Sequence, residues 1–194
     1  SQHLSHLVED ILDWSNVQAD DRQRELKPLA VRELLQECAD MVSAEVQQRD
    51  LRLNLDLPGE SLQIAADRRR LRQVILNLLS NAMKYNKVGG DITLTYQVAA
   101  GHVRLIVEDT GIGIPAEKQD QVFEPFQRLG RENTAILGTG IGLSLCKEFA
   151  AHQNGVMGLH SEEGIGSSFW IELPVLDVAL APASDAAAKP VAAR

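Results

Sequence analysis

The residues best suited to chemistry lie on one expected helix, which spans residues 67–86. Asn77, Asn81 and Lys84 follow one another at intervals of four and three residues, which places them on one face, opposite or oblique to the leucines. Such a line of amides and an ammonium group can hold a hydrated divalent cation and its bridged phosphates, because Mg²⁺ takes oxygen ligands and keeps several waters. A solvated polar face would show the same pattern, so the spacing alone leaves both interpretations open.

Glycine-rich segments elsewhere could let the backbone approach a ligand. The segment Asp109–Pro115 directly follows an apolar strand pattern, and Asp109 would offer a carboxylate acceptor there. The segment Gly138–Gly142 opens an expected helix over residues 141–152, whose free amide groups could bind phosphate. A tight loop and a flexible connector would explain these segments as well when each is taken alone. A further pair of glycines, Gly164–Gly166, fits a turn between strands.

The spacing of apolar residues predicts the elements that must position these groups. Helices are expected over about residues 31–48, 67–86 and 141–152, and strands over about 51–57, 62–65, 92–98, 103–107, 156–161 and 167–173. The apolar face of the earliest of these helices consists of Leu34, Leu35, Cys38, Met41, Val42 and Val46. Segregated helices and strands predict an α+β fold, a two-layer α/β sandwich in which helices cover one face of a mixed β-sheet.

Local signals mark where several of these elements begin or end. Asp67 is a good N-cap for the helix that follows it. Ala100-Gly101 suggests a hairpin between two alternating strands. A charged joint over residues 20–27 ends at Pro28. The region that follows the first glycine-rich segment, up to Gly140, has no regular pattern. These signals predict that the chemistry-bearing segments lie at the ends of regular elements.

The two ends of the chain differ from the middle. An N-terminal helix over the first 20 residues is predicted by apolar residues at helical spacing, which are Leu4, Leu7, Ile11, Trp14 (or Leu12) and Val17. This helix could pack on the following domain or form half of a helical hairpin. After Leu176 the chain is rich in Ala and Pro without periodicity, which predicts a disordered tail or a linker.

Composition narrows the class of protein. The 194 residues carry 19 Lys and Arg against 27 Asp and Glu, a formal net charge of −8, which argues against general nucleic-acid binding. No apolar run is long enough for a membrane helix, and the polar first residues do not form a signal peptide. Cys38 and Cys146 lie in apolar-periodic segments without metal or disulfide spacing, which predicts a reducing, cytoplasmic location.

The order and spacing of the polar segments resemble the ATP-binding domain of bacterial sensor histidine kinases. The resemblance covers about residues 22–176. The N-terminal helix predicted over the first 20 residues looks like the second helix of that family's dimerisation hairpin. It implies a hairpin remnant over residues 1–21, a catalytic ATP-binding domain over 22–176 and a tail or linker over 177–194. The matching blocks are an N box, a first glycine box, an F box and a second glycine box, at Asn77–Asn86, Asp109–Gly113, Phe123–Phe126 and Gly138–Gly142.

The resemblance also implies a role for single residues. Asn77 and Asn81 match the amides that hold Mg²⁺ and phosphate, and Lys84 matches a phosphate-facing lysine. Tyr85 matches an aromatic residue that lines the nucleotide cleft, and Asp109 matches the acceptor of the adenine amino group. The other implied nucleotide-binding residues, several of them in the lid of the site, are Gly111, Gly113, Ile114, Phe126, Arg128, Gly138, Thr139, Gly140, Gly142 and Leu143. Phe123 and Phe126 would anchor the lid, in which Arg131 also lies.

The implied reaction is transfer of the γ-phosphoryl group of ATP, with Mg²⁺, to a histidine on a dimerisation helix outside this chain. Asn77 and Lys84 would be the catalytic residues. Related ATPases of the fold, gyrase and the heat-shock chaperones, carry a water-activating Glu at the position of Asn77, so an amide there favours transfer over hydrolysis. His3 and His6 lack the acidic residue and Pro that follow the family's acceptor histidine.

The resemblance further implies the partners of the domain. They are the phosphoacceptor helix, a homodimer mate and the receiver domain of a response regulator, with any membrane contact made only by other regions. Two alternatives remain open, a non-catalytic dimerising regulator of another kinase and an ATP-hydrolysing member of the same superfamily.

Overall fold

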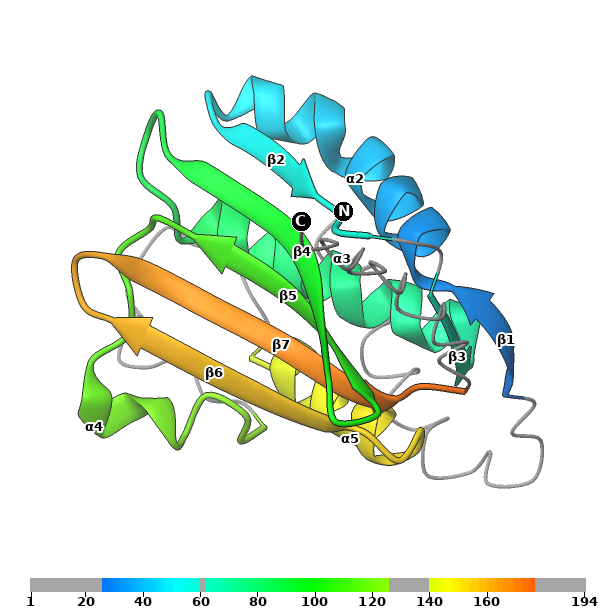
Figure 1. Ribbon diagram of the computed structural model, residues 1–194. Helices are drawn as coiled ribbons and strands as arrows, with labels where there is room; N and C mark the ends of the chain where they lie inside the picture. The colour runs from blue at the N-terminus through cyan, green and yellow to red at the C-terminus, as the bar shows by residue number, and fades with distance from the viewer. Residues whose placement is uncertain (1–25, 60–61, 126–139, 177–194) are drawn as a thin grey trace, which may run out of the picture.

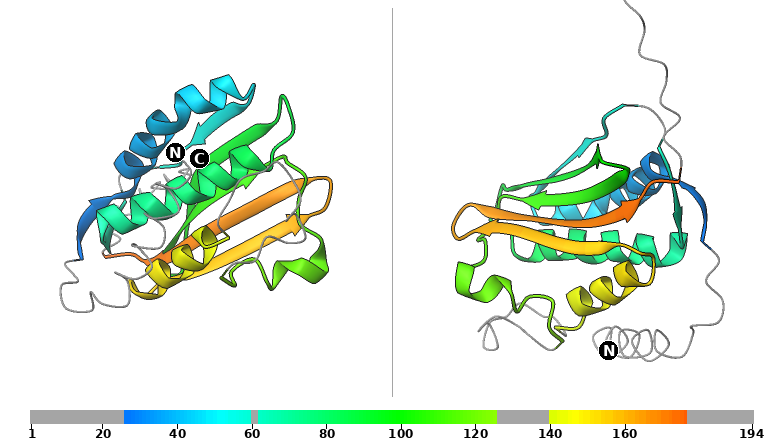
Figure 2. Two further views of the ribbon diagram at one scale, coloured as in Figure 1. Left: turned by 180° about the vertical axis from the view of Figure 1, so that it is seen from behind. Right: turned by 60° about the horizontal axis from the view of Figure 1, so that its bottom comes forward.

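A five-stranded mixed β-sheet forms one layer of the fold, and helices lie against one of its faces (Figure 1). The computed structural model describes residues 26–59, 62–125 and 140–176. The covering helices are α2, α3 and α5, which span Val31–Gln48, Arg68–Lys84 and Gly142–Ala151. Figure 2 shows the same two layers from behind and from below. The arrangement confirms the predicted α+β sandwich.

The order of strands in the sheet is β2–β4–β5–β7–β6. β2 pairs parallel with β4, and the other neighbours are antiparallel. Parallel neighbours need a crossover connection, which α3 provides between β2 and β4. The bounds of the five strands are Arg52–Asp56 (β2), Asp91–Ala99 (β4), His102–Asp109 (β5), Val156–Glu162 (β6) and Gly166–Pro174 (β7).

A second, two-stranded sheet was not predicted in full. β1 (Lys27–Ala30) pairs antiparallel with β3 (Gln63–Ala66), where the sequence predicted a strand only for the latter. The predicted end of the charged joint, at Pro28, is therefore wrong, because that proline lies inside β1; residues 20–25 of the joint lie outside the described residues. Leu29 and its partner Ile64 are buried. The segment Lys27–Ala30 is too short to show an alternation of apolar and polar residues, and its strand conformation follows from pairing with β3.

Helix α2 matches the predicted range, but one residue of its predicted apolar face is wrong. Leu35, Cys38 and Val42 are buried against the sheet and α3, whereas Met41 is 57% exposed. Each residue turns an α-helix by about 100°, so Met41 lies well to one side of Val42, at the edge of the buried stripe.

Helix α3 presents two distinct faces. Its first turn is capped by Asp67, whose Oδ1 accepts hydrogen bonds from the backbone N–H groups of Arg69 and Arg70 at 3.0 and 3.1 Å. One face is buried, and the residues of the other that the sequence singled out, Asn77, Asn81 and Lys84, are only half-buried. The buried residues are Leu71, Val74, Ile75, Leu78, Leu79, Ala82 and Met83.

The turns follow the sequence signals closely. Ala100 and Gly101 both have positive φ, 51° and 78°, and they connect β4 to β5 as the predicted hairpin. Gly164 lies in the turn between β6 and β7, also as predicted. One short helix, α4 (Ala116–Gln119), occupies part of the region that was predicted to be irregular. The predicted N-terminal helix, lid stretch and tail lie outside the described residues.

Candidate active site

The polar face of α3 meets the first turn of α5. The Asn77 Nδ2 group donates a hydrogen bond to the buried Cys146 Sγ at 3.6 Å. Gly142 opens α5 beside the same side chain, since a Cβ atom there would lie 3.7 Å from the amide atoms of Asn77. The structure thus brings together the predicted N box and the described end of the second glycine box.

This junction suits a cation held by neutral oxygens. Among the described residues, no group of three or more His, Cys, Asp or Glu side chains could hold a metal ion. The Asn77 amide nitrogen is used by the thiol, and its amide oxygen is the atom that can act as a metal ligand. A Mg²⁺ ion here would take amide and phosphate oxygens together with water, which is a set that Mg²⁺ accepts. The residues present therefore fit Mg²⁺.

The first glycine box is attached to the C-terminal end of α3. The backbone N–H of Ile112 donates to the carbonyl oxygen of Tyr85 at 3.1 Å. A Cβ atom on Gly111 would collide with that same carbonyl and with the Asp109 carboxylate. Only glycine allows this approach, so the loop after β5 packs directly against the end of the N box.

Asp109 ends β5 in a half-buried position between β4 and β7. Its Oδ1 accepts a hydrogen bond from the backbone N–H of Gly111 at 2.8 Å. Burial raises the pKa of this carboxyl from 3.8 to about 6, while the backbone hydrogen bonds from Gly111 and Ser167 act in the opposite direction. A half-buried carboxylate with part of its acceptor capacity left can accept a further hydrogen bond from a ligand.

Gly113 has a backbone conformation and a close neighbour that a residue with a Cβ atom would not tolerate. Its φ is +64°, and a Cβ atom would overlap the carbonyl oxygen of Glu162 in β6. Ile114 follows it and is half-buried against the core. The loop after Asp109 therefore lies directly against the end of β6, a contact that the sequence did not predict.

Some of the remaining predicted residues lie within the described part of the chain, and the others lie outside it. Gly140 has a φ of +73°, and Leu143 packs on the core from the first turn of α5. Phe123 contacts Phe169 edge-on, with ring centroids 6.4 Å apart. Lys84 lies in the last turn of α3. The lid residues Phe126, Arg128, Arg131, Gly138 and Thr139 lie outside the described residues.

Residues 66–177 match the model of a family described as histidine kinase-, DNA gyrase B- and HSP90-like ATPases. The chain belongs to this ATPase family. The match includes α3, the loop after Asp109 and the start of α5, which are the segments that meet in the structure. The family match confirms the resemblance on which the predicted ATP site rests.

Several named relatives of the chain are histidine kinases. Histidine protein kinase DivJ of Caulobacter vibrioides is 35% identical over 174 residues, which are 90% of this chain and 29% of that protein. Full-length ShkA in complex with AMPPNP has a TM-score of 0.78 at 30% identity, covering 89% of this chain and 36% of that one. ThkA in complex with the response regulator TrrA has a TM-score of 0.72 at 26% identity, covering 89% and 47%. The chain is similar to part of each of these proteins, and it spans less than half of the length of each one.

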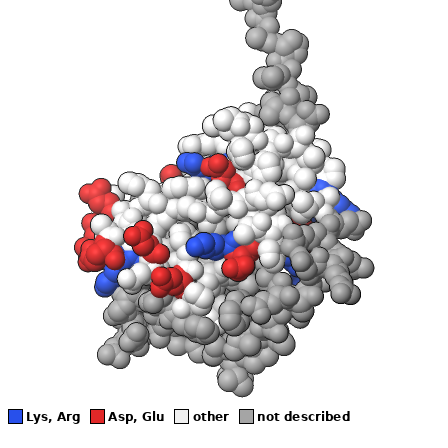
Figure 3. Space-filling view, turned by 90° about the horizontal axis from the view of Figure 1, so that it is seen from below, with Lys and Arg blue, Asp and Glu red and all other residues white. Residues whose placement is uncertain are grey.

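Surface charge within this ATPase domain is unevenly distributed. Figure 3 shows Asp and Glu side chains gathered at the end where α4 and the β6–β7 turn lie. A polyanionic nucleotide therefore needs locally placed cations, such as Lys84 or a bound metal ion. The exposed acidic residues of these elements and the segments beside them are Glu117, Asp120, Glu124, Glu162 and Glu163.

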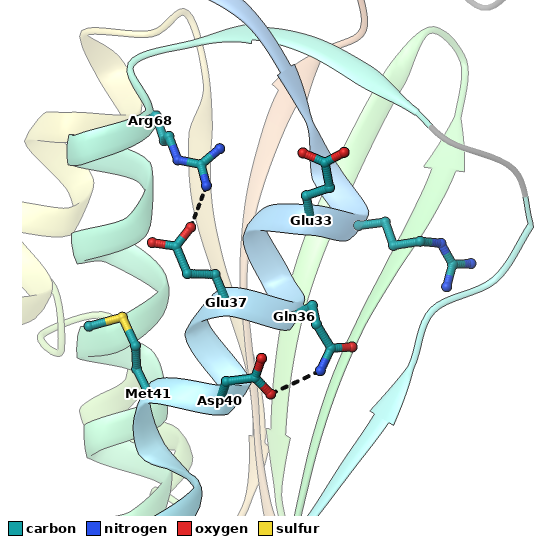
Figure 4. A pocket seen from close by; sticks show the side chains of 7 residues that line it. Glu33, Gln36, Glu37, Asp40, Met41 and Arg68 are labelled. Carbon is teal, nitrogen blue, oxygen red and sulfur yellow. Dashed lines mark hydrogen bonds and ion pairs between the residues drawn. The ribbon is translucent and has the colours of Figure 1, made fainter.

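A separate hollow lies on α2 (Figure 4). Glu37, one of its lining residues, is held by ion pairs to Arg68 and Arg72, which lower the pKa of its carboxyl. None of the predicted site residues lines this hollow, so it is not part of the candidate active site. Its lining consists of Arg32, Glu33, Gln36, Glu37, Asp40, Met41 and Arg68.

The raised pKa of Asp109 predicts opposite pH trends for nucleotide affinity and for stability. Below about pH 6 the carboxyl gains a proton and becomes a poorer acceptor, so ATP affinity should fall between pH 7 and 5. The stability that this group contributes is fully present below its ordinary pKa of 3.8 and is lost as the pH rises through about 6. Dissociation constants and thermal unfolding of the wild type, each referred to Asp109→Asn at the same pH, measure both trends. Identical profiles for the two proteins would contradict the assignment.

Proposed function

We propose that this domain transfers the γ-phosphoryl group of ATP to a histidine on a dimerisation helix. The observation that carries the proposal is that α3 contacts both other segments, the first turn of α5 at Asn77 and the loop that follows Asp109 at Tyr85. Side-chain amides can bind a metal ion, the backbone amides at a helix N-terminus can bind a phosphate, and a half-buried carboxylate can accept a hydrogen bond from a base.

Each of these groups has a separate task in the proposal. Asp109 accepts a hydrogen bond from the adenine amino group, and Gly111 and Gly113 allow the backbone to approach the base. Tyr85 lines the cleft at the end of α3, and Lys84 contributes positive charge to the phosphates from the helix's last turn. Holding the phosphates and balancing their charge is most of what phosphoryl transfer requires.

Asn77 and Asn81 would hold Mg²⁺ through their amide oxygens. When bound, the ion neutralises charge on the phosphate oxygens. Asn77 also bears on the fate of the phosphoryl group. An amide cannot take a proton from water, so this side chain does not promote hydrolysis, and an incoming imidazole supplies its own nucleophilic nitrogen.

The proposal extends to the partners and location of the protein. The acceptor histidine belongs to a dimerisation helix rather than to His3 or His6, and the phosphoryl group passes on to the receiver domain of a response regulator. The structure of ThkA with TrrA supports a partner of this kind. We place the domain in the cytoplasm and keep the division into residues 1–21, 22–176 and 177–194 as part of the proposal. None of the described helices is long and apolar enough to span a membrane.

Labelled ATP tests this function and its two alternatives. We expect the chain with Mg²⁺ to bind ATP, release little inorganic phosphate and leave His3 and His6 unlabelled. A separate helical hairpin that carries a histidine, an acidic residue and a Pro in the family's order should become labelled when added. Stable label on His3 or His6 would contradict the assignment of the acceptor. Rapid phosphate release would instead favour an ATP-hydrolysing machine, and absence of nucleotide binding would favour a non-catalytic regulator.

A further inference from the structure

A buried hydroxyl near the end of β6 connects the loop after Asp109 to β7. Ser161 is only 9% exposed, and its Oγ accepts a hydrogen bond from the backbone N–H of Ile114 at 2.9 Å. The same oxygen lies 2.9 Å from the carbonyl oxygen of Gly166 and 2.9 Å from the Oγ of Ser167. Ser161 is not among the predicted site residues, although it binds one of them, Ile114.

The direction of these bonds follows from the number of protons. A hydroxyl donates one hydrogen bond and accepts two. Ser161 uses its single proton on the carbonyl oxygen of Gly166, so the hydroxyl of Ser167 must donate to Ser161. The backbone N–H of Ser167 in turn donates to the carboxylate of Asp109. A chain of hydrogen bonds therefore connects Ile114 to the candidate base acceptor through Ser161 and Ser167.

Gln119 fastens the same loop from its other side. Its Nε2 group donates to the carbonyl oxygen of Ile114 at 2.9 Å and to the carbonyl oxygen of Ser161 at 2.8 Å. The Gln119 amide thus connects the end of the loop to β6, and the Ser161 hydroxyl makes a second connection between them. Ile114 is held at both its N–H and its carbonyl oxygen, one by each side chain.

We propose that Ser161 and Gln119 are positioning residues that set adenine specificity, an inference that rests on the proposed role of Asp109. They hold the loop against β6 and β7, so that the Asp109 carboxylate and the loop backbone keep the spacing that a base edge requires. Adenine presents an amino donor at position 6, whereas guanine presents a carbonyl acceptor that a carboxylate repels. A loosened loop should therefore lose affinity for ATP and leave the weak binding of GTP nearly unchanged.

A purely structural role would give a different result. Loss of a buried hydrogen bond that only stabilises the fold lowers the melting temperature and leaves the ratio of ATP to GTP affinity unchanged in the folded protein. The base preference is therefore the readout that separates positioning from stability.

The experiment uses the full chain with Mg²⁺ and measures dissociation constants for ATP and GTP by competition with a fluorescent ATP analogue. Ser161→Ala removes the hydroxyl, and Gln119→Met keeps the length of the side chain but removes its donor. We expect each change to weaken ATP about three- to tenfold and to change GTP affinity less than about twofold. If Ser161→Ala does not fold, Gln119→Met provides the same test, because Gln119 is only half-buried.

Ser168→Ala is the matched control, because its hydroxyl lies on β7 beside Ser167 but donates a hydrogen bond to the exposed Glu108, at 3.4 Å. It should retain the wild-type preference for ATP. Asp109→Asn, measured in parallel, separates the two levels of the proposal. If it lowers the ATP preference and neither Ser161→Ala nor Gln119→Met does, the positioning role is overturned. If Asp109→Asn also leaves the preference for ATP over GTP unchanged, Asp109 does not contact the base, and the positioning role of Ser161 and Gln119 is overturned as well.

Discussion

Replacing Asn77 with alanine is expected to lower Mg²⁺-dependent affinity for ATP by about a hundredfold or more. Changes to residues that merely support metal ligands typically cost about 10–100-fold in metal affinity, so loss of a ligand should reach the upper end of this range. Asn77 lies half-buried at the junction of α3 and α5, and its amide nitrogen is already bound to the Cys146 thiol. The amide oxygen is the group that the substitution removes from the metal.

Calorimetric titration with a non-hydrolysable ATP analogue, with and without Mg²⁺, measures this effect. The variant should bind the analogue nearly as the wild type does when Mg²⁺ is absent, and should gain little when it is added. Asn54→Ala makes the same chemical change at an exposed position on β2 and should behave as the wild type. A wild-type response of the Asn77→Ala variant to Mg²⁺ would show that this amide is not a ligand.

Asp109→Asn is expected to weaken ATP binding about tenfold or more. A hydrogen bond to a charged group contributes about 1.5–3 kcal/mol, and an amide nitrogen turned toward the adenine amino group would set donor against donor. The backbone N–H of Gly111 can still donate to the remaining amide oxygen, so the loop should keep its shape. The loss should therefore appear in affinity rather than in folding.

Titration of the same analogue checks this second prediction, and Glu108→Gln provides its control. Glu108 precedes Asp109 on β5 but is exposed, so the matched loss of a carboxylate there should leave affinity unchanged. Equal dissociation constants for Asp109→Asn and the wild type would show that this carboxylate does not contact the base.

Periodicity predicted most of the fold because most elements bury one face continuously. Helix α3 and the β4–β5 hairpin show long regular patterns with clear end signals at Asp67 and at Ala100-Gly101. β1 was missed because its four residues include Pro28, which indicates a break rather than a strand. Met41 was misplaced because helical spacing does not define where a buried stripe ends.

The candidate site could be predicted in its local motifs but not in the contacts between them. Asn77 and Asp109 were identified by spacing and by position after a strand. The hydrogen bonds that Ser161 and Ser167 make depend on pairing between distant strands. One signal was present in the sequence, because Ser167 is in phase with the inward-facing residues of β7, Phe169 and Ile171. A polar residue in an apolar register indicates a buried hydrogen bond rather than a solvated face.

The central claim is that this domain binds ATP through Mg²⁺ at the junction of α3, α5 and the loop after Asp109. Calorimetric titration of ATP into the wild-type chain, with and without Mg²⁺, tests it most directly. We expect saturable binding at a single site that is markedly tighter with Mg²⁺. Absence of binding at millimolar ATP with Mg²⁺, or equal affinity in its absence, would contradict the claim.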